Sequence, residues 1–415
     1  MNDVERSLTE CKASAEFLRT TSLAQRNRTL QAMAETLDQQ RPVLLAANAK
    51  DMQVAKELSS AMQDRLLLND ARIDSMIKGL REIIELPDPI ASRRPFSQPP
   101  SGIQVYKQRI PLGVILMIYE ARPNVAVDAA ALTLKAGNAV LLRGGKEANH
   151  SNRAIHELWQ QALNVAEIPG AAISILTDTG HEQMRELLQQ EAFIDRVIPR
   201  GGQGLIEFVA EHSRIPVIRH YKGVCHLYVD AQADLAMAEQ LLIDGKCSRP
   251  GVCNALETLL LHADIAEAFI PRLQRIAEHQ SLQLFAETYT AKKLAKASVI
   301  DEQGYDIEYL DKKLSVKIVN SIQEALAHIA RHGSQHTEVI CTDNPESAEH
   351  FLRAVDASAV MVNASSRFND GGELGLGAEI GIATTKLHAY GPMGLESLTA
   401  EKFVVLGRGE VRHPL

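Results

Sequence analysis

The chain of 415 residues is too long for one compact core, and its hydrophobic content of 45% can fill two domains. A net charge of −8 provides no basic stripe for nucleic acid or an anionic membrane, which leaves a small-molecule partner as the expectation. No apolar run approaches the roughly 18 residues that cross a bilayer, so we expect no membrane partner. The opening segment lacks the basic and apolar blocks of a secretory signal, and we expect a cytoplasmic protein.

The first ninety residues are predicted to be helical, because apolar residues such as Leu30, Met33 and Leu37 recur on one helical face. Beyond them, short β-rich runs alternate with helical stretches, and this rhythm is typical of βαβ units in a parallel sheet. The first series of runs is 113–120, 139–145, 173–178, 196–202 and 226–230. The second series is 255–262, 314–319, 338–343 and 358–364.

The two series predict an α/β protein with two parallel-sheet domains. We expect the cofactor-binding domain to comprise residues 1–96 and 111–230, and the catalytic domain to comprise 231–383. Residues 97–110 and 384–415 fit neither series. They read as extended, edge-like segments, and we expect them to form a small β arm that pairs with another subunit of a homo-oligomer.

Two predicted strands end in glycine loops, at Gly144 and Gly145 and at Gly201 and Gly202. Glycine between a strand and a helix lets backbone N–H groups approach a phosphate at the helix N-terminus. Neither loop matches G-x-G-x-x-G, and the basic residues Arg143 and Lys146 stand beside the first one. Cations there favour a 2′-phosphate, which indicates NADP(H). The alternative is a pair of ordinary βα turns with a solvated Arg and Lys.

The segment KCSRPGVCNALETLLL, which begins at Lys246, contains Cys247 and Cys253 around a Pro-Gly turn. The spacing is poor for structural zinc, and no second pair is near in sequence, so we expect no metal. The five cysteines are scattered and odd in number, as in a protein with reduced thiols. Core packing of both side chains is the alternative. Because Cys253 follows two residues that break regular structure, we expect it in a loop, where a thiolate can act as a nucleophile.

At this point the chain resembles the glutamate-5-semialdehyde dehydrogenases, also called γ-glutamyl phosphate reductases, of the aldehyde dehydrogenase superfamily. The resemblance covers nearly the whole chain, and its most specific segment is VNSIQEALAHIARHGSQHTEVI, at 319–340. Other matching segments are PLGVILMIYEARPNVAVDAAALTLKAGNAVLLRGGKEA, VIPRGGQGL, SRPGVCNALETLLL and VNASSRFNDGGELGLGAEIGIATTKLHAYGPMGL. It implies an aldehyde dehydrogenase-like fold with a cofactor domain, a catalytic domain and an oligomerisation arm.

The resemblance assigns the nucleophile to Cys253, and it implies NADPH-dependent reduction of L-glutamyl 5-phosphate in proline biosynthesis. The thiolate expels phosphate to form a thioester, and hydride transfer then yields glutamate 5-semialdehyde. Hydrolytic members of the superfamily carry a Glu-Leu-Gly-Gly stretch whose glutamate activates water. This chain has no glutamate in the matching segment PVIRHYKGVCHLYVD, which fits an enzyme that must not hydrolyse its thioester.

The remaining candidate residues each have a structural alternative. Asn124, with the Cys253 backbone N–H, is a candidate oxyanion donor or else a turn-forming residue after proline. Glu308 is expected to hold the nicotinamide ribose by its place in the resemblance, or else to be a solvated surface acid. The candidates for the charged groups of the substrate, with salt bridging or turn capping as alternatives, are Arg122, Ser365, Ser366 and Arg367. His332 and His336 are predicted to be structural.

Two other functions remain open from sequence. An acylating or hydrolytic aldehyde dehydrogenase would keep Cys253 and change the acyl acceptor, and a nucleotide-binding scaffold would keep the sheets without turnover. Acyl phosphates hydrolyse readily, so association with glutamate 5-kinase, which makes the substrate, is a further expected partnership.

Overall fold

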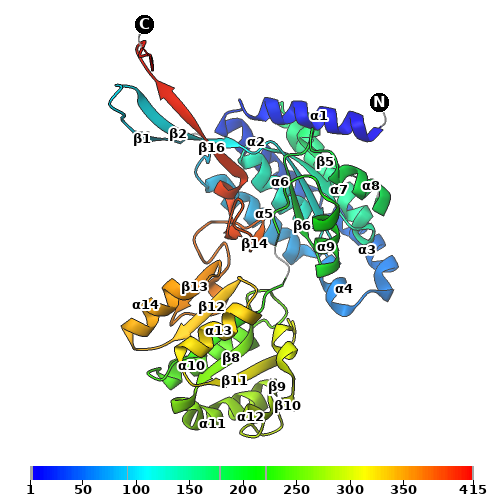
Figure 1. The fold of residues 1–415 in the computed structure, drawn as a ribbon. Helices are drawn as coiled ribbons and strands as arrows, with labels where there is room; N and C mark the ends of the chain where they lie inside the picture. Colours follow the sequence, from blue (N-terminus) through cyan, green and yellow to red (C-terminus); the bar gives the residue numbers. More distant parts are fainter. Residues whose placement is uncertain (1–2, 91, 177–178, 220–221, 414–415) are drawn as a thin grey trace. The chain divides into compact units, whose positions relative to one another are not determined.

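The computed structural model describes residues 3–90, 92–176, 179–219 and 222–413, and the chain folds into two compact units. Unit 1 is formed by the described residues up to Arg219, by Leu376–Gly381 and by the chain from Met393 onward. Unit 2 is formed by the described part of His220–Gly375 and by Ile382–Pro392. Figure 1 draws both with their helices and strands labelled.

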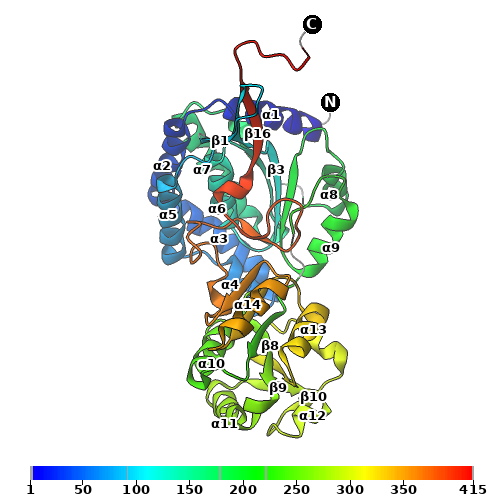
Figure 2. The ribbon, with the colours of Figure 1, turned by 60° about the vertical axis from the view of Figure 1, so that its left-hand side comes forward.

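Unit 1 contains a four-stranded parallel sheet in the order β5-β4-β3-β6. Its strands are β3 (Val114–Tyr119), β4 (Ala139–Arg143), β5 (Ile173–Ile175) and β6 (Arg196–Arg200). Every residue of β3 and β4 is buried, as expected for central strands covered on both faces. In Figure 2, α2 and α5 lie on one side of this sheet and α8 and α9 on the other. All four strands were predicted; Thr177 and Asp178, the last residues of one predicted run, lie outside the described residues.

The helices of unit 1 confirm the prediction that the first ninety residues are helical. Side chains of Ser22 and Asn69 accept hydrogen bonds from the first turns of α2 and α5, and such caps fix where these helices begin. The helices are α1 (Asp3–Leu18), α2 (Leu23–Gln39), α3 (Arg41–Val54), α4 (Ser60–Leu66), α5 (Asp70–Glu85), α6 (Val125–Lys135), α7 (Asn149–Val165), α8 (His181–Leu188) and α9 (Gln203–His212).

Unit 2 contains a seven-stranded parallel sheet in the order β10-β9-β11-β8-β7-β12-β13. The strands are β7 (Cys225–Val229), β8 (Leu256–His262), β9 (Gln283–Ala286), β10 (Ser298–Val299), β11 (Lys313–Val319), β12 (Thr337–Cys341) and β13 (Ala359–Val362). The helices are α10 (Leu235–Leu242), α11 (Ala263–Gln280), α12 (Thr288–Ala291), α13 (Ile322–His332) and α14 (Pro345–Ala354). Buried side chains of β7, β8 and β11 pack against α10 and α11 in the core.

The run 226–230 belongs to a different sheet from the one that its place in the sequence suggested. We expected it in the first domain, whereas β7 pairs with β8 and β12 in unit 2, and the division between the units falls at Arg219. Alternation of strands and helices reveals a βαβ unit but does not reveal which sheet the next strand joins. The short strands β9 and β10 were not predicted.

Three antiparallel strands of unit 1 form a separate sheet in the order β1-β2-β16. They are β1 (Arg93–Ser97), β2 (Gln104–Pro111) and β16 (Thr399–Leu406), and Figure 1 shows them extending away from the helices of their unit. On this arm Phe96 and Phe403 meet edge to face with ring centroids 5.3 Å apart. Both rings are more than half exposed.

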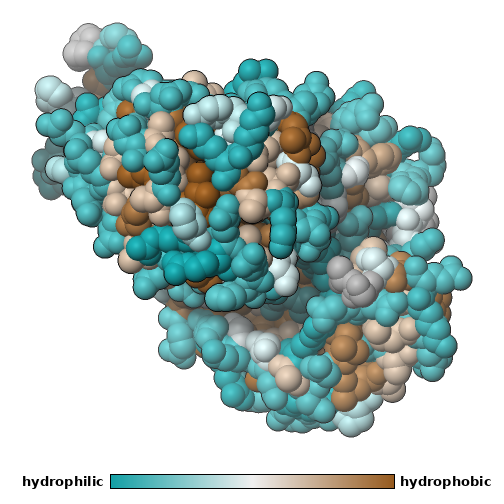
Figure 3. Space-filling model, turned by 90° about the horizontal axis from the view of Figure 1, so that it is seen from below, coloured by the Kyte–Doolittle hydropathy of each residue, from teal (hydrophilic) through white to brown (hydrophobic). Residues whose placement is uncertain are grey.

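The chain crosses between the units through β14 (Gly381–Ala383) and β15 (Gly391–Met393), which form a two-stranded sheet. On the face drawn in Figure 3 the surface is mostly hydrophilic, with scattered apolar groups.

Candidate active site

Cys253 lies in a loop between a π-helix and the amino end of a buried strand. The π-helix spans Ile243–Cys247, and β8 begins at Leu256. π-helical turns are rare and are frequently found at functional sites. Pro250 and Gly251 interrupt regular structure before the cysteine, and the Cys253 side chain is half-buried. The structure therefore confirms the predicted loop and shows that Cys253 is not a core thiol.

The backbone of Cys253 is packed against the residues that lead into β7. A Cβ added at Gly223 would overlap the Cys253 carbonyl oxygen and lie 2.8 Å from its Cα. The thiol of Cys225 donates to the same carbonyl at 3.2 Å, and burial raises the Cys225 pKa well above its usual value. Cys225 is thus a buried, protonated thiol that helps to hold the loop, whereas Cys253 is the more accessible of the two.

Glu308 is tied to the same group of residues. Its Oε1 accepts a hydrogen bond from the Gly223 N–H at 2.8 Å. The side chain is half-buried, and this burial raises its pKa. A carboxylate has more acceptor positions than this one bond uses, so Glu308 can also accept from a ligand hydroxyl.

A buried ion pair stands at the base of the Cys253 loop. Lys246 Nζ lies 2.7 Å from Glu257 Oε2, and both side chains are 0% exposed. Burial raises the pKa of Glu257 to about 7 and lowers that of Lys246, while the attraction of each charge for the other opposes both shifts. Sequence reasoning missed this pair, although a glutamate inside the run LETLLL was a signal for it.

The segment after β13 packs beside Cys253 from the other side. The Ser366 hydroxyl donates to the Asn254 carbonyl at 2.7 Å, and the Asn254 side chain donates to the Asn369 carbonyl at 3.1 Å. The Ser365 hydroxyl accepts from the Arg367 N–H at 3.3 Å. Both serines are buried and Arg367 is half-buried. The bonds of Asn254 place the NASSRF segment next to the cysteine loop, whereas the Ser365 hydroxyl binds within its own segment.

In unit 1 the first glycine loop is already occupied by side chains. Asp51 accepts from the N–H groups of His150 and Ser151, which are the amides of the first turn of α7. Arg143 is buried, and its guanidinium donates to the carbonyl oxygens of Thr179 and Gly180. This arrangement leaves little of the α7 N-terminus for an anion.

The second glycine loop is more open. Helix α9 begins directly after Gly202 without a side-chain cap, and a Cβ at Gly204 would meet nothing within 4 Å. The Gly202 N–H donates to Glu120 Oε2 at 2.8 Å. At Gly201 a Cβ would come within 2.5 Å of the same carboxylate, so a larger residue there would require the Glu120 side chain to shift. The exposed Lys146 is the accessible cation of the two basic candidates.

Asn124 lies immediately before α6, where its side-chain N–H donates to Asp128 Oδ2 at 3.1 Å. Burial raises the pKa of Asp128 to about 6. Arg122 is half-buried in the same segment. Both candidates lie beyond the carboxyl end of β3, at the edge of the parallel sheet where ligands of α/β proteins commonly bind.

The two histidines predicted to be structural are buried and hydrogen-bonded. His332 Nδ1 lies 2.8 Å from Asp306 and its Nε2 lies 3.0 Å from Glu302. His336 Nδ1 lies 2.7 Å from the Thr337 hydroxyl. His332 therefore joins α13 to the 302–306 segment, whereas this bond of His336 is to its neighbour in the chain.

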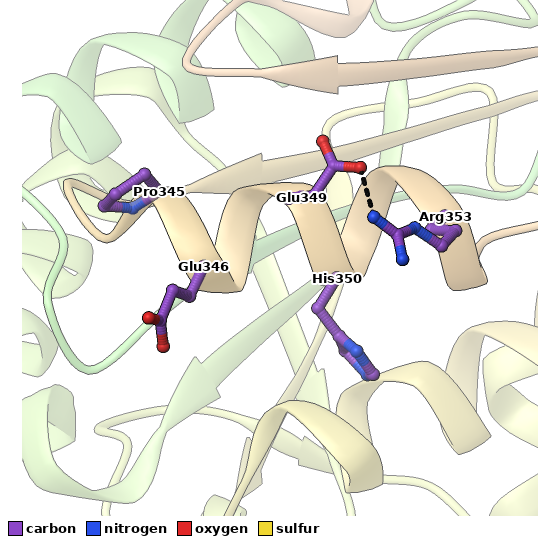
Figure 4. Close-up of a pocket in the computed structure, with 5 residues that line it drawn as sticks. All are labelled: Pro345, Glu346, Glu349, His350 and Arg353. Atoms are coloured by element: carbon purple, nitrogen blue, oxygen red, sulfur yellow. Dashed lines mark hydrogen bonds and ion pairs between the residues drawn. The ribbon is translucent and has the colours of Figure 1, made fainter.

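Two hollows on the surface of unit 2 are not lined by Cys253 or Glu308. One, of about 390 Å³, is lined by Pro345, Glu346, Glu349, His350 and Arg353, all on α14. Figure 4 shows these side chains along one helix, with Glu349 paired to Arg353. Another, of about 320 Å³, is lined in part by Cys247. Cys247 thus lies at a surface hollow and is distinct from the Cys253 loop.

Within the described residues, no group of three or more His, Cys, Asp or Glu side chains is arranged to hold a metal ion. None of the helices in the described ranges combines the length and the apolar character needed to cross a bilayer.

Comparison with known proteins gives consistent matches along the chain. The model of the aldehyde dehydrogenase family matches residues 1–289. A γ-glutamyl phosphate reductase of Salinibacter ruber is 55% identical over 98% of this chain and 94% of its own length. One from Xanthomonas axonopodis pv. citri is 53% identical over 97% of this chain and 98% of its own. The crystal structure of γ-glutamyl phosphate reductase from Thermotoga maritima superimposes with a TM-score of 0.97, at 38% identity, over 99% of this chain and 100% of that one.

Proposed function

The chain belongs to the aldehyde dehydrogenase family and, within it, to the γ-glutamyl phosphate reductases, and from this premise we propose how its own residues carry out the reaction. It is an oxidoreductase that interconverts γ-glutamyl phosphate and glutamate 5-semialdehyde, in proline biosynthesis, with a nicotinamide cofactor. The observation that carries the proposal is the accessible Cys253, in a loop whose backbone is held by its neighbours.

In the reductive direction, the Cys253 thiolate attacks the acyl carbon of L-glutamyl 5-phosphate, and inorganic phosphate leaves with the bonding electron pair. The bound cofactor, when reduced, supplies a hydride to the resulting thioester. The oxyanion of the tetrahedral adduct then re-forms the carbonyl and the carbon–sulfur bond breaks, which releases the aldehyde and restores the thiolate without net proton uptake. The Cys253 backbone N–H is the proposed donor to the developing oxyanion, with Asn124 as a second donor.

The residues of unit 1 fit the phosphate groups of a dinucleotide. The N-terminus of α9 follows Gly201 and Gly202, and its dipole favours an anion, although the Glu120 carboxylate already accepts from the Gly202 N–H and would have to move aside for a phosphate. Lys146 is the proposed partner of a 2′-phosphate, which favours NADP(H), and Arg143 shapes the loop from within. In unit 2, Glu308 is the proposed acceptor for a ribose hydroxyl. Arg122 and Arg367 are the proposed partners of the substrate carboxylate and phosphate, with Ser365 and Ser366 placing the latter arginine.

The proposed assembly is a cytoplasmic homo-oligomer joined through the β1-β2-β16 arm. The arm exposes Phe96, Phe403 and Val405 on an isolated three-stranded sheet, which is unusual for a surface that stays in water. Because the substrate is an unstable acyl phosphate, we also propose that the enzyme associates with glutamate 5-kinase.

The deciding experiment assays the purified protein in the oxidative direction with glutamate 5-semialdehyde and NADP⁺, with and without phosphate. We expect NADPH formation that depends on phosphate and falls at least a thousandfold in Cys253→Ser, because serine is a far weaker nucleophile at neutral pH. Cys247→Ser is the matched control and should retain activity. Equal turnover without phosphate would indicate a hydrolytic enzyme, and an active Cys253→Ser would refute the assignment of the nucleophile.

A further inference from the structure

The buried pair Lys246 and Glu257 brackets the loop that carries Cys253. Lys246 lies in the π-helix and Glu257 is the second residue of β8, so the pair joins two positions 11 residues apart across a distance of 2.7 Å. The loop that contains Cys253 begins just after Lys246 and ends just before Glu257. The ion pair therefore fixes the two ends of this loop relative to each other.

The second oxygen of Glu257 extends the pair to a neighbouring loop. Glu257 Oε1 accepts from the Leu310 N–H at 3.2 Å, and Leu310 has a left-handed backbone with φ of 52°. A left-handed leucine is strained and persists only where surrounding bonds hold it. Two residues earlier in the same loop, Glu308 accepts from the Gly223 N–H at 2.8 Å, and Gly223 packs against the Cys253 backbone. The ion pair thus restrains Cys253 in two ways. It holds the two ends of the Cys253 loop, and it holds the Leu310 loop, whose Glu308 binds Gly223.

Stability alone does not explain why charged residues occupy this place. Two apolar side chains of the same size in a buried position are often as stable as an ion pair, because the charges must give up their hydration. An ion pair differs in being directional, since only one arrangement satisfies the ammonium, both carboxylate oxygens and the Leu310 N–H. In some proteins a buried polar or ionic contact of this kind selects a single arrangement of the chain.

We propose that Lys246 and Glu257 are positioning residues, which hold the Cys253 backbone in the arrangement from which the thiolate attacks and the N–H meets the oxyanion. This inference rests on the proposed role of Cys253 as the nucleophile. It predicts a loss in the chemical step rather than in substrate binding, because neither side chain is exposed to a ligand.

The test compares the wild type with a double variant that carries both Lys246→Met and Glu257→Gln. These two substitutions remove both charges and keep the approximate side-chain volumes. We expect kcat for semialdehyde oxidation to fall at least fivefold per folded molecule while KM for semialdehyde and phosphate stays within threefold. The matched control is Arg272→Met with Glu239→Gln, which removes a partly exposed ion pair of 3.0 Å from α10 and α11 of the same unit and should leave kcat unchanged.

Circular dichroism and thermal unfolding establish the folded fraction. If the double variant does not fold, the single variant Glu257→Asp is assayed instead and judged by the same limits on kcat and KM. Aspartate keeps a charge beside Lys246 but is too short to bind the Leu310 N–H. A loss in kcat below fivefold, or a loss confined to KM, overturns the positioning role. An active Cys253→Ser would instead refute the nucleophile, so the two failures are distinguishable.

Discussion

Gly223 shows how a residue without a side chain can determine a reactive group's position. The space where its Cβ would stand is filled by the Cys253 backbone, and its N–H is bound by Glu308. Displacing backbone atoms requires more energy than displacing the end of a flexible side chain. The position therefore depends on glycine for close approach rather than for unusual dihedral angles.

Replacing Gly223 with alanine should displace the Cys253 backbone and lower kcat at least tenfold. The matched control is Gly251→Ala in the cysteine loop itself, where a Cβ would lie 3.6 Å from the Leu310 carbonyl oxygen, an ordinary contact. Steady-state kinetics of both variants, normalised to folded protein, measure the effect. Equal activity of the two variants would show that the close contact does not hold the nucleophile.

The individual residues of the site differ in how far sequence could reveal them. The loop position of Cys253 was predictable because a proline and a glycine precede it. Lys246 and Glu257 were not, because their pairing depends on how the π-helix and β8 lie against each other, and no local pattern encodes that contact. Ser365 caps the turn that follows it, as in the capping alternative raised from sequence, whereas Ser366 donates to Asn254 of the cysteine loop, a contact that no local pattern encodes.

At the scale of elements, the strands that contain apolar runs were predictable, including the three-residue β5, whereas β9 and β10 were not. The buried β3 and β8 are continuous apolar segments or nearly so, whereas β10 is two exposed residues, Ser298–Val299, recognisable only by its pairing with β9. The assignment of β7 to a sheet depended on long-range pairing for the same reason.

The arm carries its own prediction. Phe403 on β16 is 61% exposed and lies beside Phe96, with Lys107 over both rings. Phe403→Asp should shift the protein to a smaller species in size-exclusion chromatography with light scattering, because an interface that buries this ring cannot accept an unpaired charge. The control is Leu387→Asp, at a 90% exposed leucine that the predicted arm segment 384–415 included but that the structure places in unit 2, outside the β1-β2-β16 sheet. An unchanged mass for Phe403→Asp would argue against association through this sheet.

At the scale of the whole molecule, buried titratable groups set a limit on acid stability. His328 packs edge to face against the rings of His226 and Tyr305, and neither of its ring nitrogens has a hydrogen-bond partner among the described residues. Burial lowers its pKa to about 2, and the neighbouring His226 and Lys317 add to the effect. In the unfolded chain a histidine titrates near pH 6.5, at about its unperturbed pKa.

The direction in which stability changes with pH follows from proton uptake. Below about pH 6.5, His328 binds a proton in the unfolded chain, whereas in the folded protein it binds one only near pH 2. The free energy of unfolding therefore falls as the pH falls through this range. Between pH 7.5 and 5, His328 should account for about 2 kcal/mol of lost unfolding free energy. Urea unfolding at the two pH values should show that His328→Leu loses less unfolding free energy than the wild type, by that amount. His350→Leu, at an exposed histidine of α14, is the control, and equal pH dependence of the two variants would contradict the assignment.

The pairing of β2 with β16 joins residues 104–111 to 399–406, with all of unit 2 encoded between them. During synthesis the ribosome therefore releases β2 long before its partner strand, and it releases every strand of unit 2 in the interval. A nascent chain interrupted anywhere before residue 399 leaves β2 with one edge open. Translation thus delays formation of the arm sheet, and any subunit association that uses it, until the last strand has emerged.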